Sequence, residues 1–287
     1  MDNKKISIGT AQFGLKYGVT NKKKKLDLLE IKDILKLAKK HKINNIDTAY
    51  EYGDAEKKLG LVGVKEWNIS SKFPFIPNKE NIENWIQSKV KKSLSRLKVK
   101  KINTLFVHDS SQLESYKISK KIFACMNKLK NDGFIDKIGC SIYNPTILNK
   151  ISKDFKIDTI QAPANLIDTR IFQKQHQLTL KNQKIKLEIR SIFLQGLLIE
   201  NPKNIPLKFK KFKSFFSNLQ NFNKKNEISA ISSATSFLYN KKFDKLIIGV
   251  TSSQQLMNFI LNAKIKFLKT PKFKIDNKEY LINPYLW

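Results

Sequence analysis

Four polar residues in the first half of the chain have the types and spacing of a proton-transfer site. Asp47, Tyr52, Lys72 and His108 stand at or just beyond the ends of short apolar runs. A tyrosine has a pKa of about 10 and is by itself a reluctant acid or base at neutral pH. A nearby ammonium lowers that pKa, and a carboxylate beside the ammonium keeps it charged and positioned. With a histidine to hold a substrate oxygen in line, the set suits proton transfer to a carbonyl oxygen.

Each of these residues also has an ordinary structural explanation. Asp47 suits the turn before a helix, Tyr52 suits half-buried packing, and Lys72 is one of many lysines. His108 is harder to explain by packing alone, because it ends the apolar run LFVH. Their joint occurrence at the ends of successive runs favours the catalytic interpretation over four separate coincidences.

The elements that must position these residues are short apolar runs alternating with amphipathic segments. The runs cover residues 6–13, 45–49, 67–73, 102–108, 137–142, 159–164, 187–194 and 245–250. Bounded by polar residues or glycine, they predict strands. Helical spacing of apolar residues occurs in 31–38, 82–97, 113–129 and 256–263. Such alternation implies parallel strands joined by helical crossovers.

The predicted fold class is α/β, a (β/α)8 TIM barrel that forms a single domain over residues 1–287. A doubly wound open sheet is the alternative, but the first strand ends in GTAQFG, which lacks the GxGxxG fingerprint. In a barrel the carboxyl ends of the strands share one mouth, so the four polar residues are expected to converge there. Residues 201–226 predict an extended loop and helix at the mouth. Residues 266–287 predict an irregular aromatic tail that packs back over the barrel.

Composition limits the class of protein. The 287 residues are 41% apolar, enough for a substantial core, and contain no run of about 18 apolar residues that would predict a membrane span. The first apolar run is too short for a signal peptide, so we expect a cytoplasmic protein. Two cysteines, Cys125 and Cys140, and three scattered histidines indicate neither a disulfide framework nor a metal site.

The formal charge of +31 raises the question of an anionic partner. Of the 55 lysines and arginines only Arg96, Arg170 and Arg190 are arginines, the residue favoured for phosphate and base contacts. The lysines are spread along the chain, and the run 22–25 reads as a loop. We therefore expect a solvated lysine-rich surface and no specific nucleic-acid partner, with attraction of an anionic partner or substrate left open. Nothing in the sequence indicates an oligomeric state.

Three segments together resemble the aldo-keto reductase superfamily, and the resemblance spans residues 6 to about 260. NNIDTAYEYGDAEKKLG contains Asp47 and Tyr52, ISSKF contains Lys72, and LFVHD contains His108. The resemblance implies an NAD(P)H-dependent oxidoreductase that reduces an aldehyde or ketone to an alcohol. Tyr52 would be the proton donor, Lys72 and Asp47 would tune it, and His108 would orient the carbonyl. A cofactor-binding regulatory or interaction subunit on the same fold is the alternative, against which the intact quartet argues.

The same resemblance implies a nicotinamide site. Ser141 in IGCSIYN and Gln161 in TIQAPAN match residues that hold the carboxamide, although Ile142 replaces the usual asparagine. RSIFLQGLL resembles the segment over the nicotinamide and pyrophosphate, with Arg190 in place of the usual aromatic residue. A guanidinium plane can also stack, and a salt bridge at the barrel rim is the alternative. The expected cofactor residues are Thr10, Ala11, Asp47, Ser141, Gln161, Arg190, Ser191, Phe193, Gly196, Gly249, Val250, Thr251, Ser252 and Gln255.

The adenosine end of the cofactor is less defined. IIGVTSSQQLMNFI resembles the loop and helix that bind it, and amides at a helix N-terminus suit a phosphate. Whether Gln254 or Gln255 takes the family position is open. The resemblance implies NADP(H), but no basic residue occupies positions 250–251, which leaves NAD(H) open. The substrate is expected among loops 17–25, 75–78, 110–112 and 201–226, whose polarity suits a sugar or another polar metabolite.

Overall fold

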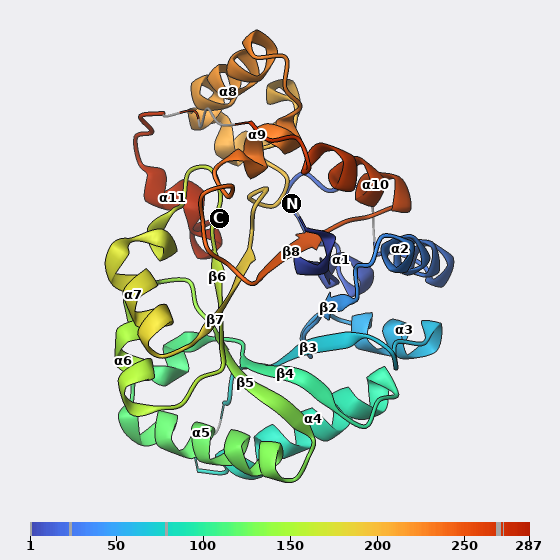
Figure 1. The fold of residues 1–287 in the computed structure, drawn as a ribbon, viewed down its shortest axis with the longest axis vertical. Coiled ribbons are helices and arrows are strands. Elements are labelled where there is room, and N and C mark those ends of the chain that lie inside the picture. Colours follow the sequence, from blue (N-terminus) through green and yellow to red (C-terminus); the bar gives the residue numbers. More distant parts are fainter. Residues whose placement is uncertain (1, 23–24, 78–79, 268–270, 272) are drawn as a thin grey trace.

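Eight parallel strands close into a barrel in the computed structural model of the chain, which describes residues 2–22, 25–77, 80–267, 271 and 273–287. Each strand pairs with the next, and the last returns to pair with the first (Figure 1). The strands are β1 (Ile6–Gly9), β2 (Asn45–Asp47), β3 (Asn68–Phe73), β4 (Ile102–Val107), β5 (Ile135–Ser141), β6 (Thr159–Pro163), β7 (Lys186–Arg190) and β8 (Lys245–Gly249). The predicted (β/α)8 barrel is therefore confirmed.

Two predicted strands extend too far, and the other six agree with the structure within two residues. The run 6–13 predicts one strand, but β1 ends at Gly9 and Ala11–Gly14 forms the short helix α1. Thr10 has already left the extended region, with φ −110° and ψ 13°. The run 187–194 ends as a strand at Arg190, because Ser191 adopts a left-handed φ of 62°. In both places the chain turns away from the barrel into a mouth loop.

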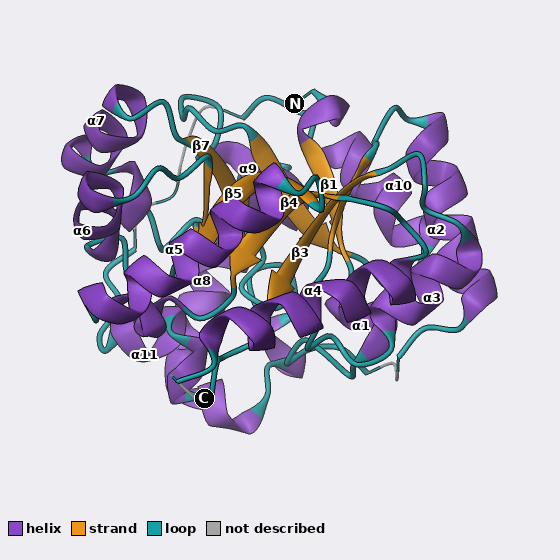
Figure 2. Cartoon of the chain, turned by 90° about the horizontal axis from the view of Figure 1, so that it is seen from below, coloured by secondary structure: helices purple, strands orange, loops and turns teal. Residues whose placement is uncertain are grey.

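Amphipathic helices surround the barrel, as Figure 2 shows around the orange strands. Helix α2 begins with a capping box between Asp27 and Glu30 and buries the expected stripe at residues 31–38. The helix predicted over 113–129 instead divides into a 3-10 turn, η2 (Ser110–Leu113), and α5. The covering helices are α2 (Leu28–Lys40), α3 (Ala55–Val62), α4 (Ile82–Leu97), α5 (Tyr116–Asn131), α6 (Ile147–Asp154), α7 (Lys174–Asn182) and α10 (Ser253–Asn262).

The chain between β7 and β8 forms a separate layer, visible above the barrel in Figure 1. It contains η4 (Pro202–Asn204), η5 (Leu207–Phe212), α8 (Lys213–Lys225) and α9 (Ala230–Ser236), so the expected loop and helix at 201–226 are present. The tail is more regular than predicted, because it forms α11 (Lys278–Ile282) and η6 (Pro284–Leu286).

Aromatic contacts hold the tail against this layer. Tyr280 stacks on Phe212 at 6.1 Å, and Trp287 meets Phe209 edge-on at 4.9 Å. These contacts connect the tail to the segment after β7, whereas the sequence predicts packing over the barrel itself. The expected loops at 22–25 and 75–78 and the tail from 266 each include residues outside the described ones, namely 23–24, 78 and 268–270 with 272.

The register of the sheet places the functional strand ends at one level. Asp47 pairs with Gly9 on one side and with Ser70 on the other, and Lys72 pairs with Phe106 of β4. Ser141 of β5 pairs with Gln161 of β6. These side chains therefore reach the same mouth of the barrel. Among the helices that the structure describes, none is both long and apolar enough to cross a membrane.

Candidate active site

Asp47 and Lys72 form a buried ion pair at the mouth of the barrel. The Lys72 ammonium donates to both carboxylate oxygens of Asp47 at 2.7 Å and to the Thr48 carbonyl oxygen at 3.0 Å. Only 1% of the Lys72 side chain and 4% of the Asp47 side chain is exposed. In a site with so little water each charge depends on the other, because removing one leaves its partner buried and uncompensated.

Tyr52 follows β2 by five residues and lies beside this ion pair. Its ring centre is 5.3 Å from the Lys72 nitrogen and 5.8 Å from the His108 ring, which it meets edge-on. Helix α1 supports the Tyr52 backbone, because a Cβ atom on Gly14 would overlap the Tyr52 carbonyl oxygen. Glycine at that position therefore allows the two segments to pack closely and fixes the loop that carries Tyr52.

Burial raises the pKa of the Tyr52 phenol above its usual range, and the negative charge of Asp47 adds to the rise while Arg190 opposes it. The net shift of this pKa is upward, so any lowering by the Lys72 ammonium is outweighed. The Lys72 charge is balanced by Asp47, and desolvation is the largest effect on the phenol. A phenol with a raised pKa keeps its proton at neutral pH. Tyr52 is therefore expected to be a neutral phenol that can donate a proton, and not a phenolate.

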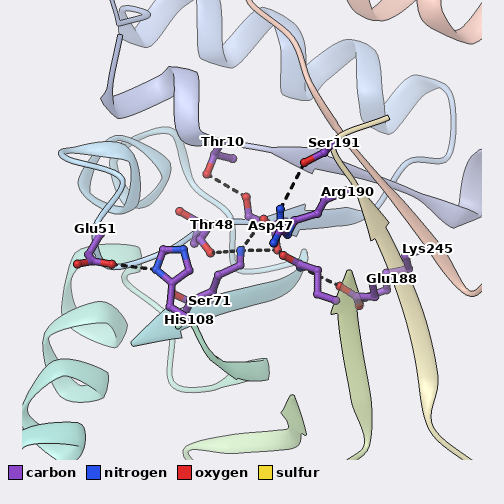
Figure 3. A network of polar contacts seen from close by, with 12 residues as sticks. Thr10, Asp47, Thr48, Glu51, Ser71, His108, Glu188, Arg190, Ser191 and Lys245 are labelled. Carbon is purple, nitrogen blue, oxygen red and sulfur yellow. Dashed lines mark hydrogen bonds and ion pairs between the residues drawn. The ribbon is translucent and has the colours of Figure 1, made fainter. Parts of the chain in front are cut away.

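His108 follows β4 directly and lines the same cavity as Tyr52. Its Nδ1 atom lies 2.9 Å from Glu51 Oε2 (Figure 3). Because a carboxylate only accepts hydrogen bonds, Nδ1 carries the proton in this contact. Glu51 therefore fixes the orientation of the ring. The sequence reasoning missed Glu51, although its place between Asp47 and Tyr52 was a signal.

A second buried carboxylate lies deeper in the barrel. Glu188 of β7 accepts from the Gln161 amide at 3.3 Å and pairs with Lys245 of β8 at 3.1 Å (Figure 3). The same Gln161 amide nitrogen donates to Asp47 Oδ1 at 2.7 Å. Gln161 thus connects the Asp47–Lys72 pair to the Glu188–Lys245 pair. The sequence reasoning missed Glu188, whose signal was an acidic residue in the middle of strand β7, between Leu187 and Ile189.

The carbonyl end of Gln161 is left as an available acceptor. With two carboxylates fixing its nitrogen, the Gln161 side chain must direct Oε1 away from them, and this buried oxygen has no hydrogen-bond partner among the described residues. Buried polar atoms are rarely left without a partner. Gln161 and its strand neighbour Ser141 both line the cavity. The pair therefore fits a ligand with an N–H donor, such as a carboxamide.

Arg190 closes β7 at the mouth and stacks on Tyr143. The guanidinium carbon lies 4.0 Å from the Tyr143 ring centre. The guanidinium also donates to the Ile142 carbonyl oxygen and to the Ser191 hydroxyl, each at 3.3 Å. Within the described part of the chain no carboxylate lies within 4.0 Å of Arg190, so the alternative of a rim salt bridge is wrong.

These residues surround one cavity of about 880 Å³, in the range of small-molecule sites. Almost every residue predicted for the site lines it; Ser252 does not. The predicted residues that line it are Thr10, Ala11, Asp47, Tyr52, Lys72, His108, Ser141, Gln161, Arg190, Ser191, Phe193, Gly196, Gly249, Val250, Thr251 and Gln255. The structure brings them together, and their individual roles stay predictions. Tyr143 also lines the cavity and was not predicted as a site residue, whereas Tyr17, which lines it too, begins the loop 17–25 in which the substrate is expected.

The loop after β7 has an unusual backbone. Ser191, Leu194 and Gln195 adopt φ values of 62°, 48° and 53°, and Gly196 follows with φ 96°. Residues other than glycine rarely adopt this left-handed region, and clusters of them are typical of ligand-binding loops. The Thr20 hydroxyl donates to the Gln195 carbonyl oxygen at 3.2 Å. The loop after β1 therefore reaches across the mouth to the loop after β7.

The N-terminus of α10, which follows β8, also borders the cavity. The Ser252 hydroxyl caps the helix by accepting from the Gln255 backbone N–H at 3.1 Å. The Gln255 side chain accepts from the Thr251 N–H at 2.8 Å, and Gln255 lines the cavity whereas Gln254 does not. Of the two registers that the sequence leaves open, the structure places Gln255 at the cavity.

The described residues contain no group of three or more histidine, cysteine, aspartate or glutamate side chains arranged to hold a metal ion. Cys125 and Cys140 are both buried and free. Burial raises the pKa of both thiols, to about 12 for Cys125 and beyond the usual range for Cys140. Neither cysteine is therefore a ready nucleophile.

A barrel with a tyrosine, a lysine–aspartate pair and a histidine at its mouth defines a class of barrel oxidoreductases, and comparison with known proteins agrees. The model of the aldo/keto reductase family matches residues 5–275. The chain belongs to the aldo/keto reductase family.

Three proteins similar to this chain share 29% identity or less with it. The chain is 29% identical over 179 residues to the glyoxal reductase of Bacillus subtilis, a match that covers 60% of this chain and 61% of that protein. Two solved structures of Pseudomonas aeruginosa proteins, provisionally classed as aldo-keto reductases, share the fold at 18% identity. Their TM-scores are 0.65 and 0.64, and the matches cover 90% of this chain and 89% and 88% of theirs.

Proposed function

We propose that the protein reduces an aldehyde or ketone to an alcohol with a nicotinamide cofactor and that Tyr52 donates the proton. The observation that carries this proposal is the placement of Tyr52 beside the Lys72–Asp47 pair and His108 in one cavity. A bound reduced nicotinamide would supply the hydride. A positioned acid of this kind contributes roughly 100- to 10,000-fold to the rate.

Each member of the quartet has a distinct task in this proposal. His108, oriented by Glu51, holds the carbonyl oxygen near the Tyr52 hydroxyl in its doubly protonated form, in which Nδ1 donates to Glu51 and the other ring nitrogen donates to the carbonyl oxygen. Tyr52 transfers its proton to that oxygen as negative charge develops on it. The Lys72 ammonium stabilises the phenolate that remains, and Asp47 keeps Lys72 charged and in place. The walls of the cavity limit access of water to the reacting groups.

The cofactor residues are those predicted from the sequence. Ser141 and Gln161 would hold the carboxamide, since Gln161 Oε1 is an acceptor that lacks a donor. Arg190 would lie at the nicotinamide, and the loop 191–196 and the start of α10 would bind the pyrophosphate and adenosine ends. We propose NADP(H) as the cofactor, because the basic residue Lys22 lines the cavity. NAD(H) is the alternative, because positions 250–251 hold no basic residue.

We propose a small-molecule carbonyl substrate, no metal and no specific nucleic-acid partner, in a single barrel domain that acts in the cytoplasm. Any binding to nucleic acid should be weak and should fall steeply with salt. Because the Bacillus subtilis relative is named a glyoxal reductase, glyoxal and other small dicarbonyls are the first substrates to test, followed by polar sugars.

The test measures cofactor oxidation at 340 nm (the absorbance of the reduced nicotinamide) with purified protein and a panel of carbonyls. We expect turnover with NADPH or NADH, and a loss of at least about 100-fold in kcat in Tyr52→Phe. Tyr116→Phe, on the outer helix α5, is the control and should keep the wild-type rate. Unchanged turnover in Tyr52→Phe would refute the assigned role. Tight cofactor binding without turnover on any carbonyl would instead support a regulatory or interaction subunit.

A further inference from the structure

Arg190 differs from Lys72 and His108, which line the same cavity, in its partners. Lys72 pairs with Asp47 at 2.7 Å, and the His108 ring lies 2.9 Å from Glu51. Across the described residues, Arg190 has no carboxylate within salt-bridge distance. Its contacts are a tyrosine ring, a hydroxyl and a backbone carbonyl oxygen. The Arg190 guanidinium therefore brings a positive charge into the cavity that no neighbouring carboxylate neutralises.

The position of this charge is fixed by the sheet. Arg190 pairs in register with Pro163, two residues beyond Gln161 on β6. Its guanidinium donates to the carbonyl oxygen of Ile142, the residue after Ser141. Arg190 thus lies closer to the mouth of the barrel than the Ser141–Gln161 pair does. In Figure 3 its side chain reaches from the end of β7 to the Ser191 side chain.

The contacts also hold the guanidinium in place. Tyr143 covers it at 4.0 Å, and two hydrogen bonds at its nitrogens restrain its orientation. A stacked and hydrogen-bonded guanidinium cannot swing into solvent without losing these contacts. A ligand whose carboxamide is held by Ser141 and Gln161 therefore shares the cavity with a fixed positive charge.

We propose that Arg190 makes the site selective for charge, so that the protein binds the reduced, uncharged nicotinamide ring more tightly than the oxidised, cationic ring. This inference rests on the proposed function, because it takes the nicotinamide carboxamide to be the ligand of Ser141 and Gln161. The physical reason is repulsion between two positive charges in a partly buried site, where Coulomb interactions are stronger than in bulk water. An aromatic residue in place of Arg190 has no net charge and exerts no such repulsion.

The consequence concerns product release. Each turnover converts a bound neutral ring into a cationic one, and the fixed charge of Arg190 then opposes its retention. The oxidised cofactor should leave readily and should inhibit only weakly when it accumulates. Since the two cofactor forms carry the same phosphates, contacts with those groups cancel in the ratio of their dissociation constants. The ratio therefore reports the environment of the ring alone.

The experiment measures dissociation constants of the wild-type protein for NADPH and NADP+ by fluorescence titration and calorimetry. We expect NADP+ to bind at least about tenfold more weakly than NADPH, since Coulomb repulsion at such a site readily reaches that size. In Arg190→Met, which keeps the length of the side chain and removes its charge, the ratio should fall by about tenfold. In Arg190→Lys, which keeps the charge, most of the preference should remain.

Arg190→Gln repeats the test with a neutral polar side chain, and the unfolding temperature of each variant establishes that it is folded. An unchanged ratio in the folded Met and Gln variants would overturn the proposal. An equal loss of affinity for both forms would also overturn it, by identifying Arg190 as a stacking group without charge selection. Failure of the wild-type protein to bind any nicotinamide nucleotide would refute the proposed function itself, which distinguishes the two failures.

Discussion

The Gln161 side-chain amide donates to Asp47 Oδ1 at 2.7 Å, and the Lys72 ammonium donates to the same carboxylate. One carboxylate therefore connects the proposed proton-transfer group with the residue proposed to hold the cofactor. Because Asp47 is buried, both donors contribute to its stability as an anion. A substitution at Gln161 should therefore affect the Asp47–Lys72 pair, and a substitution in that pair should affect Gln161.

Replacing Gln161 with methionine should weaken cofactor binding and slow turnover together. The variant loses the acceptor Oε1 and also a donor to Asp47. Loss of one hydrogen bond of ordinary strength corresponds to about a three- to tenfold rise in the dissociation constant of the cofactor, measured by fluorescence titration. Gln87→Met, on the outer face of α4, is the control. Wild-type affinity in Gln161→Met would show that the ligand makes no contact with this amide.

Removal of the ammonium from the buried ion pair should be costly for stability. In Lys72→Met the Asp47 carboxylate stays buried without its cation, and we expect a loss of about 3–5 kcal/mol in the free energy of unfolding. The double variant Asp47→Asn with Lys72→Met removes both charges and should recover a large part of that loss. Urea unfolding followed by circular dichroism measures both values. Equal stability of the single and double variants would contradict this account.

The convergence of Asp47, Lys72 and His108 at one mouth was predictable because of simple geometry. Asp47, Lys72 and His108 stand at the ends of strands, and a parallel barrel brings such ends to one mouth whatever the loops do. The strands themselves follow from short apolar runs between polar segments. The order of elements and the quartet therefore required only local patterns and the rule that successive parallel strands are neighbours.

Other features depend on contacts that no local pattern contains. Glu188 and Lys245 are separated by 57 positions and meet only because β7 and β8 pair. The direction of the Tyr52 pKa shift depends on how deeply the barrel mouth buries the phenol, which the sequence does not reveal. The packing of Trp287 on Phe209 likewise joins distant segments.

The buried Glu188 predicts a specific pH dependence of stability. Burial raises the pKa of this carboxyl above its ordinary value of 4.5, the charge of Lys245 opposes the rise, and Asp47 adds to it. In the unfolded chain Glu188 ionises near pH 4.5, whereas in the folded protein it holds its proton to higher pH. The contribution of Glu188 to the free energy of unfolding is therefore full below pH 4.5. It is lost as the pH rises through the folded-state pKa.

Glu188→Gln should remove this part of the pH dependence. Between pH 4.5 and the folded-state pKa, the free energy of unfolding of the wild type should fall relative to that of the variant, by at most about 1.4 kcal/mol per pH unit. Urea unfolding at a series of pH values measures the difference. The control is Glu114→Gln, at an exposed position, whose free energy of unfolding should change with pH as that of the wild type does. A constant difference between the wild type and Glu188→Gln would contradict the assignment.

The close packing of Gly14 on the Tyr52 backbone predicts that stability and activity can be separated. In Gly14→Ala the new methyl group meets the Tyr52 carbonyl oxygen and the Ala55 nitrogen, neither of which can move without shifting the Tyr52 loop. Such overpacking costs about 1–3 kcal/mol. Gly133→Ala is a matched control, because φ there is 79° with no atom within 4 Å of the new methyl. Its strain also costs about 1–2 kcal/mol, far from the cavity.

We therefore expect both alanine variants to lose similar stability, whereas only Gly14→Ala loses activity. A displacement of the Tyr52 hydroxyl by about 1 Å lowers kcat/KM by about 100-fold, because proton transfer depends steeply on alignment. Steady-state reduction of the best carbonyl substrate, alongside urea unfolding of each variant, measures the two effects independently. Equal activity of the Gly14 and Gly133 variants would show that the contact between α1 and the Tyr52 loop has no part in placing the proton donor.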